Sequence, residues 1–389
     1  MTKQVANVQL MQKMNRLKVL DYVRRHVDAS RTDIAQATGL SLASITNITA
    51  YLLEKGIISE SGVENADRVG RKRTLLRFCA DRYATVCVII EDRIAHVLLT
   101  DLEGEILQAE QLKTGRLSME RVLEDITASI VRMQQIEGAP AVLAVGVSVS
   151  GIVLEDGQFL VSNQMKWKNF PLRQRLEEMV GLPVYVENVS FLRAVAYFST
   201  MNTHEDINML FVDMENGIGA VQYYNGAITR GTLGEIGHTT LQRDGEPCFC
   251  GNRGCLEAMC NPKRLLSLYS SASGEQAVGL SDIHCLHSEK NPHAMVAVEE
   301  CGSYLGVGMA NLVNLFNPSA IVINTGDFTL CPAVFHVAEQ ELRRRAYSAL
   351  TQELTIEKVD LTHEEMVRGM AFHLCNQLFD LSCPHNIIE

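Results

Sequence analysis

Apolar residues in the first part of the chain recur at helical spacing, with short polar breaks between the stripes. The first stripe predicts a helix over residues 10–28, with apolar positions at Leu17, Leu20, Tyr22, Val23 and Val27. Ser30, with Asp33 three residues later, is typical of a helix N-terminus, and Gly39 is typical of a helix end. A further helix begins at Ser41, and its expected buried stripe is Ile45, Ile48, Leu52 and Leu53. Two helices joined around Gly39 predict a helix-turn-helix.

The second of these helices has a polar face of short donors and acceptors, which suit base edges and phosphates in a major groove. The residues expected on this face are Ser41, Ser44, Thr46, Asn47 and Thr49. A strand from Ile57, a polar loop and the strand TLLRF predict a wing, whose return carries Arg71, Lys72 and Arg73. Each feature has a plainer explanation, since short Ser/Thr helices are common and GRKR could be a solvated charge run. Their combination favours a winged helix-turn-helix that binds DNA.

After residue 80 the pattern changes to strands alternating with helices, which predicts an α/β body. Strands are expected at 84–90, 95–99, 106–111, 141–148, 184–187, 207–212, 220–224 and 320–324. Helices are expected at 119–135, 172–180, 190–200, 295–316, 333–346 and 367–381. Two β-rich starts, near residues 84 and 207, suggest two similar lobes.

Length and charge support a division into a small head and a large body. The chain has 389 residues, whereas a single core rarely grows past about 250–300 residues, so at least two domains are expected. Residues 1–80 carry 13 Lys+Arg and 7 Asp+Glu, a net charge of +6, whereas residues 81–389 carry −17. We therefore expect a DNA-binding domain, the head, over residues 1–80 and a body over residues 81–389. Only the basic head is expected to bind a polyanion.

The composition also favours a cytoplasmic protein without membrane insertion. No apolar run reaches the roughly 18–20 residues that a membrane helix needs. Residues 1–14 are polar and lack the apolar core of a signal peptide. The 11 cysteines are then expected to be reduced, which leaves metal binding or packing as their uses.

One segment, over residues 238–255, concentrates ligands for a soft metal ion. His238 lies ten residues before Cys248, and Cys250 and Cys255 follow with C-x-C-x4-C spacing. One imidazole and three thiolates fit tetrahedral zinc in a structural site, and Gly251 and Gly254 allow a tight fold around the ion. A loop of unliganded cysteines is the alternative, but three cysteines within eight residues of a reduced protein favour the metal.

Several motifs together resemble the ROK family of repressors, open reading frames and kinases. They are GEIGH followed by C-x-C-G-N-x-G-C-L-E, the segment GLPVYVENVS and the preceding NQMKWKNFPL. The front end, with its GR-x-R wing, is similar to the ROK repressors, among them the glucose- and N-acetylglucosamine-responsive repressors of enteric bacteria. The resemblance covers essentially the whole chain and implies an actin-like ATPase fold of two lobes with a sugar in the cleft.

The resemblance also implies which residues contact the sugar. The family's contacts correspond here to Asn188, Glu235, His238 and Glu257, with Gly151 near the sugar as backbone. In that arrangement His238 binds zinc through one ring nitrogen and offers the other to a hydroxyl. Two alternatives remain open at this point. Asn188 could be the cap of the following helix, and the two glutamates could be solvated or could support the zinc site.

Two departures from the family pattern favour a regulator over an enzyme. The kinases place a catalytic Asp directly after the Asn of their E-N-D motif, and here that position is Val189, which cannot accept a proton. The D-x-G-G-T phosphate motif is replaced by VIIEDRIAHVLL, in which the changed positions are Ile89, Glu91, Asp92 and Arg93. Carboxylates near a triphosphate repel it. The segment Asn216–Ala220, NGIGA, resembles a second phosphate loop but is weak alone.

We therefore expect a transcriptional regulator, and more specifically a repressor of sugar-uptake or catabolism genes. Its expected partners are double-stranded operator DNA, a sugar or sugar phosphate, and further copies of itself in a homodimer or homotetramer. One family member is controlled by a membrane sugar transporter, so a transporter is a further expected partner. An ATP-dependent sugar kinase with an appended DNA-binding domain is the first alternative, and a sugar-independent architectural DNA-binding protein is the second.

Overall fold

The computed structural model describes the chain except at residues 1, 64–72, 92, 116–117, 154–158, 163–166, 202–206, 230–233, 277–278 and 380–389. The chain forms two compact units. Unit 1 comprises Met1–Ser148, Pro171–Val186 and Met370–Glu389, and unit 2 comprises Val149–Phe170 and Glu187–Gly369. The expected boundary after residue 80 stays a prediction. Among the described residues, no helix is both long enough and apolar enough to cross a membrane.

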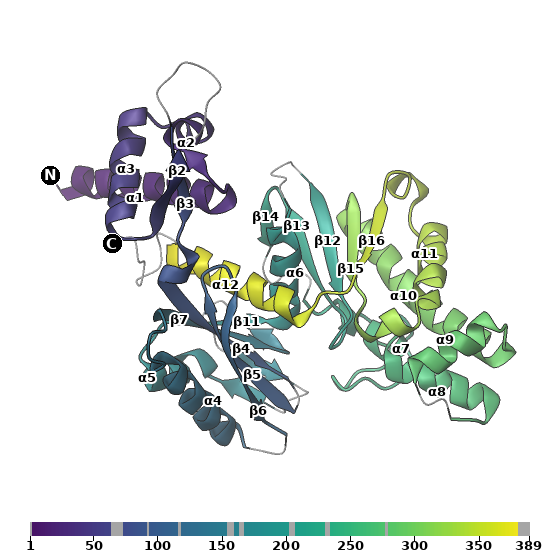
Figure 1. Ribbon diagram of the computed structural model, residues 1–389. Coiled ribbons are helices and arrows are strands. Elements are labelled where there is room, and N and C mark those ends of the chain that lie inside the picture. The colour runs from purple at the N-terminus through teal and green to yellow at the C-terminus, as the bar shows by residue number, and fades with distance from the viewer. Residues whose placement is uncertain are drawn as a thin grey trace. The chain divides into compact units, whose positions relative to one another are not determined.

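The head, which is the part of unit 1 up to Phe78, combines helices with a small antiparallel sheet (Figure 1). Its elements are α1 (Thr2–Arg25), β1 (Ala29–Ser30), α2 (Arg31–Thr38), α3 (Leu42–Glu54), β2 (Ile58–Val63) and β3 (Thr74–Phe78). The sheet order is β1-β3-β2, and the β2–β3 hairpin is the expected wing. The predicted start of α2 is confirmed, because Ser30 and Asp33 form a reciprocal capping box. Val27, expected on the apolar stripe of the first helix, lies beyond its end and is 86 % exposed.

The head shares its core with the end of the chain. Leu20 of α1, Ile45 of α3 and Leu76 of β3 are almost completely buried. The same cluster contains Cys375 and Phe379 of α12 (His363–Phe379), drawn in yellow in Figure 1. The second half of α12 is therefore a packing element of the head.

The rest of unit 1 is a five-stranded sheet with the order β11-β7-β4-β5-β6. Its strands are β4 (Tyr83–Ile90), β5 (Ile94–Asp101), β6 (Ile106–Lys113), β7 (Ala141–Val149) and β11 (Val184–Asn188), with η1 (Ala80–Arg82) before them. Helices α4 (Met119–Gln134) and α5 (Leu172–Val180) pack together beside it. A Cβ at Gly146 of β7 would lie 2.9 Å from Cδ1 of Leu374, so α12 packs closely on this strand.

Unit 2 is built on a second five-stranded sheet, with the order β14-β13-β12-β15-β16. Its strands are β12 (Asn208–Asp213), β13 (Gly219–Tyr224), β14 (Ala227–Thr229), β15 (Ala320–Asn324) and β16 (Thr355–Val359). Leu210 and Val212 of β12 pack on one face, in the cluster that contains α10 (Pro292–Phe316) and α11 (Ala333–Arg345). Met209 and Phe211 pack on the other face, in a cluster with Ala194 and Phe198 of α6 (Val189–Ser199). This burial on both faces explains the continuous apolar runs in the sequence.

The other elements of unit 2 are short or lie at its periphery. They are β8 (Ile152–Val153), β9 (Phe159–Ser162), β10 (Trp167–Phe170), η2 (Ile236–His238), α7 (Leu256–Met259), α8 (Pro262–Ser273), α9 (Leu280–Ser288), η3 (Gly326–Leu330) and η4 (Ser348–Leu350). The predicted α/β architecture with two sheets is confirmed, and the helices and strands expected after residue 80 are present within a few residues. The first helix of the head, expected at 10–28, begins earlier, at Thr2. Helices α8 and α9 and strand β16 were not predicted.

Candidate functional site

The four predicted metal ligands lie together in unit 2. The ligand atoms of His238, Cys248, Cys250 and Cys255 are all within 4.8 Å of one another. Nδ1 of His238 lies 3.5 Å from Sγ of Cys248, and the sulfurs of Cys250 and Cys255 are 3.7 Å apart. Burial raises the pKa of the Cys255 thiol to about 12, so a thiolate here needs a cation beside it. One imidazole and three sulfurs at these distances fit a tetrahedral zinc ion.

The backbone around the cluster folds back on itself through close hydrogen bonds. Cys248 N–H donates to the Asn252 carbonyl at 2.8 Å, and Gly254 N–H donates to the Glu246 carbonyl at 2.7 Å. Gly254 has φ +64°, and a Cβ there would lie 1.6 Å from the carbonyl oxygen of Gln242. Only glycine fits this position, as the sequence suggested.

His238 connects the cysteine cluster to a small polar cavity. With Nδ1 directed at Cys248, its other ring nitrogen, Nε2, lies 3.6 Å from a carboxylate oxygen of Glu235. The ring also packs edge-on against Phe249, with centroids 5.1 Å apart. A ligand on Nδ1 would fix the tautomer and leave Nε2–H as a donor toward the cavity.

All five residues expected around a sugar line this one cavity, whose volume is about 220 Å³. They are Gly151, Asn188, Glu235, His238 and Glu257. They come from the β7–β8 turn, the end of β11, the segment around η2, and α7. The cavity is also lined by Asn216, Gly217 and Gly219, which follow β12 and which we did not expect at the site.

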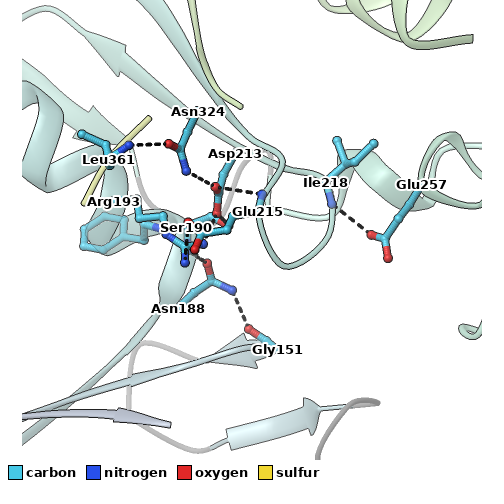
Figure 2. A network of polar contacts seen from close by, with 11 residues as sticks. Gly151, Asn188, Ser190, Arg193, Asp213, Glu215, Ile218, Glu257, Asn324 and Leu361 are labelled. Atoms are coloured by element: carbon cyan, nitrogen blue, oxygen red, sulfur yellow. Dashed lines mark hydrogen bonds and ion pairs between the residues drawn. The ribbon is translucent and has the colours of Figure 1, made fainter. Parts of the chain in front are cut away.

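Asn188 is a helix cap as well as a wall of the cavity (Figure 2). Its side-chain oxygen accepts from Ser190 N–H at 2.8 Å and from Phe191 N–H at 3.2 Å. Its side-chain nitrogen donates to the Gly151 carbonyl at 2.8 Å. The same Asn188 amide therefore caps α6 and lines the cavity, and its hydrogen bonds connect the start of α6 to the β7–β8 turn.

Glu257 reaches the cavity from α7 and is held by backbone. Its Oε2 accepts from Ile218 N–H at 3.0 Å (Figure 2). Burial raises the pKa of this carboxyl group above its ordinary value, while the Ile218 hydrogen bond and the nearby His238 act in the opposite direction. A Cβ at Gly237 would lie 2.4 Å from the Ile218 carbonyl and 3.0 Å from Glu257 Oε2, so glycine is required for this approach.

The predicted recognition helix α3 exposes most, but not all, of the residues expected to meet DNA. Ser41 caps the helix, Ser44 is half-buried, and Thr46 and Asn47 are exposed. The expectation that Thr49 lies on this face is wrong, because Thr49 is fully buried. Its hydroxyl accepts from Arg31 Nε at 2.9 Å and donates to the Thr46 carbonyl at 3.2 Å.

Part of the wing that should contact DNA falls outside the described residues. Arg71 and Lys72 are not among the positions that the structure describes, whereas Arg73 is exposed. Arg73 NH1 lies 3.7 Å from a carboxylate oxygen of Asp33, close to the start of α2. The basic return of the wing therefore begins beside the helix-turn-helix.

A family model described as the ROK family matches residues 86–377, three quarters of the chain. The chain belongs to the ROK family. Full-length relatives include the xylose repressor of Bacillus subtilis (strain 168), 25% identical with 97% of this chain and 99% of that protein covered. The DNA-binding transcriptional dual regulator NagC of Escherichia coli (strain K12) is 28% identical, with 95% and 94% covered. This chain is thus a ROK-family transcriptional regulator.

Solved ROK structures share the fold. One is a ROK family transcriptional regulator described as a homolog of the Escherichia coli MLC protein, with a TM-score of 0.81 and 23% identity. The match covers 94% of this chain and 96% of that one. A ROK family glucokinase from Streptomyces griseus, in complex with glucose and AMPPNP, has a TM-score of 0.61 at 25% identity, with 76% and 99% covered. The family model begins after the head, so the head is an addition to the body that the family shares.

In this ROK chain the loop that resembles a second phosphate loop lies beside a buried charge network. Arg193 of α6 pairs with Asp213 at 2.9 Å and with Glu215 at 2.9 Å (Figure 2). Asp213 also accepts from Ser190 Oγ at 2.7 Å and from Asn324 Nδ2 at 2.8 Å. We did not predict this network, although an Asp that ends an apolar strand three residues before N-G-I-G is a signal for it.

Proposed function

We propose that this protein is a repressor of sugar-uptake or catabolism genes whose operator affinity is controlled by a sugar or sugar phosphate in the small cavity of unit 2. One observation carries the proposal. Asn188, Glu235, His238 and Glu257 surround a single 220 Å³ cavity in a chain whose head is a winged helix-turn-helix. Small concave sites with a few convergent polar groups are the usual sites for small ligands.

The donors and acceptors of the cavity match sugar hydroxyls. The carboxylates of Glu235 and Glu257 accept hydrogen bonds, and Nε2–H of a metal-bound His238 donates one. Asn188 uses one N–H on Gly151, and the amide group has a second N–H to offer. Zinc held by His238, Cys248, Cys250 and Cys255 would keep this wall rigid and fix the histidine tautomer.

The head would hold operator DNA through the exposed residues of α3 and the wing. Ser41, Ser44, Thr46 and Asn47 suit the major groove, and Arg71, Lys72 and Arg73 suit phosphates or a minor groove. Paired heads of a homodimer or homotetramer need two half-sites about one helical turn apart or a multiple of it. A sugar that changes the spacing of the heads would lower operator affinity. A transporter as an additional protein partner stays a prediction.

Sugar phosphorylation is the alternative function, and the residues argue against it. Val189 follows Asn188 where a kinase needs a proton acceptor, and it is 7 % exposed at the start of α6. Glu91 donates its N–H to the Ile94 carbonyl in the short β4–β5 hairpin, where the kinases place a phosphate motif. Asp92 of that motif lies outside the described residues. Glu215, close to the second loop, is paired with Arg193, and its carboxylate offers phosphate oxygens no hydrogen-bond donor.

A gel-shift titration of the protein's own promoter, with and without sugars, tests the proposal. We expect binding at low salt that a particular sugar weakens, and loss of this response in Asn188→Ala. A coupled ADP-release assay over a hexose panel tests the alternative, and turnover that disappears in Asn188→Ala would establish the kinase. Operator binding that no sugar changes, together with no heat from any sugar in calorimetry, would favour the sugar-independent architectural protein.

A further inference from the structure

A second, larger cavity adjoins the small polar cavity of unit 2. Its volume is about 760 Å³, against about 220 Å³ for the polar cavity. The two share five lining residues, which are Gly151, Ile152, Asn188, Gly234 and Glu235. A ligand in the polar cavity therefore borders directly on the larger space, which is within the range of sizes seen for whole small-molecule sites.

The added space is walled mainly by apolar side chains from several elements. They are Phe191 of α6, Val221 of β13, Leu256 of α7, and Leu312, Leu315 and Phe316 of α10. Leu312 is 5 % exposed and Leu315 is 75 % exposed, so the wall runs from the core to the surface. Polar side chains also line this space, at Glu187, Thr229, Thr239, Asn311 and Asn314, but the apolar ones make up most of the wall. An apolar group placed against Phe191, Val221 and Leu315 would be removed from water.

The charges around both cavities are negative. Glu187 and Glu235 line the larger cavity, and Glu235 and Glu257 line the polar one. None of the described residues lining either cavity is Lys or Arg. Arg230, next to the lining residue Thr229, lies outside the described residues. A phosphate dianion next to these carboxylates would be repelled, so the site favours an uncharged ligand.

We propose that the effector is an unphosphorylated sugar bearing an apolar substituent, such as a glycoside with an aromatic aglycone. The sugar ring occupies the polar cavity, and the substituent lies between Phe191, Val221 and Leu315 in the larger cavity. This inference rests on the proposed function, because it extends the same sugar site. It narrows the effector from sugars in general to neutral glycosides.

Calorimetry on the full-length protein with matched probes tests this. The probes are both anomers of methyl and phenyl xyloside and glucoside, together with glucose and glucose 6-phosphate. Because a factor of ten in affinity is about 1.4 kcal/mol and a buried phenyl ring can supply that, we expect at least one phenyl glycoside to bind about tenfold or more tightly than its methyl counterpart. We also expect glucose 6-phosphate to bind more weakly than glucose. Equal affinities within every methyl and phenyl pair, or tighter binding of the phosphate, would overturn the inference.

Two matched variants separate the larger cavity from the polar one. Leu315→Asp places a charge at the open edge of the apolar wall, whereas Leu330→Asp does so at a residue that is 53 % exposed and does not line the cavity. We expect the first variant to lose the preference for phenyl glycosides while keeping its affinity for methyl glycosides, and the second to keep both.

Three outcomes would count against the inference in distinguishable ways. Binding of methyl glycosides with no gain from the phenyl group overturns this inference and leaves the sugar site standing. Failure of every glycoside to bind overturns the proposed sugar site as well. A change of oligomeric state in Leu315→Asp, measured by sedimentation, would show that the larger cavity is an interface between copies of the chain, and would overturn the assignment to a ligand.

Discussion

Arg24 of the first helix donates a 2.6 Å hydrogen bond from its guanidinium to the side-chain oxygen of Asn376, 352 residues later in the chain. The same guanidinium lies over the ring of Phe372, with its carbon 4.5 Å from the ring centroid. Nearby, the rings of Phe78 and Phe379 meet edge to face at a centroid distance of 6.4 Å. The second half of α12 is therefore part of the head's own structure, and the stability of the head depends on the end of the chain.

We predict that Phe379→Ala destabilises the head. Phe379 is 5 % exposed, and truncating a buried Phe typically costs about 3–5 kcal/mol, because a cavity is left behind. Operator binding should weaken in parallel, although the residue is far from α3 in the sequence. Thermal unfolding and gel-shift titration of the variant check this. Gln377→Ala, two residues earlier and only partly buried, is the control and should change neither. An unchanged Tm in Phe379→Ala would contradict the shared core.

The sequence predicted helix α12 but not the residues that it packs against. Apolar spacing predicted a final helix at 367–381, and the helix is present at His363–Phe379. Its partners could not be predicted, because periodicity reports which face of a helix is buried and gives no information on what covers that face. A contact between residues 352 positions apart is decided by the packing of the whole unit.

The error at Thr49 has a different origin, because the sequence contained the necessary signal. Ile45, Thr49 and Leu52 are spaced at i, i+4 and i+7, so they share one face of α3. Classing Thr49 by its polar hydroxyl instead of its position placed it on the wrong face. The cysteine cluster, by contrast, came from a local motif with restrictive spacing, and the sugar residues came from the resemblance to the ROK family. The structure brings each set together.

Substitutions at Asn47 and Thr49 should therefore have opposite effects, one on DNA affinity and the other on stability. Asn47 is exposed on α3, so Asn47→Ala should lower operator affinity about tenfold or more, as the loss of a good base contact does, without changing Tm. Thr49→Val removes the acceptor of the Arg31 hydrogen bond and should lower the free energy of unfolding by about 1–2 kcal/mol. Urea unfolding and gel shifts on both variants distinguish the two roles. A lowered Tm in Asn47→Ala with unchanged DNA affinity would reverse the assignment.

The wing is tested by its salt dependence. Each phosphate contact that is lost should reduce the slope of log affinity against log salt by about one. We expect Arg71→Ala to weaken operator binding and to flatten this slope, and Arg73→Ala to do the same. Lys113→Ala, in β6 of the body, serves as the control. Equal affinities for Arg71→Ala and the unaltered protein at several salt concentrations would remove the wing from the DNA contact.

The cysteine cluster predicts the metal content of the purified protein. Cys250→Ser should lose zinc and lower Tm by at least about 5 °C, because a structural zinc ion contributes directly to folding. Cys285→Ser is a matched control, since both cysteines are exposed and Cys285 lies outside the cluster. Atomic absorption and a thermal melt check both variants. Unchanged zinc in Cys250→Ser would contradict the ligand assignment.

Burial of Glu257 should make the free energy of unfolding depend on pH, with a sign that follows from the shift of its pKa. The folded state raises its pKa above the ordinary 4.5, mainly because burial disfavours the charged carboxylate. As pH rises past 4.5, Glu257 loses its proton in the unfolded chain before it does so in the folded protein. The free energy of unfolding therefore falls between pH 4.5 and the folded pKa. This loss of stability persists at higher pH. Glu257→Gln removes this contribution and keeps a carbonyl oxygen that can accept from Ile218 N–H.

The stability gained by Glu257→Gln over the unaltered protein should therefore grow with pH through that window, while sugar binding should weaken because the charged acceptor is lost. Urea unfolding of both proteins in parallel from pH 5 to 8 measures the difference, and contributions from the zinc ligands cancel because the two proteins share them. A difference that shrinks as pH rises would mean that Glu257 is stabilised as a carboxylate. The site would then hold its charge at no cost to folding.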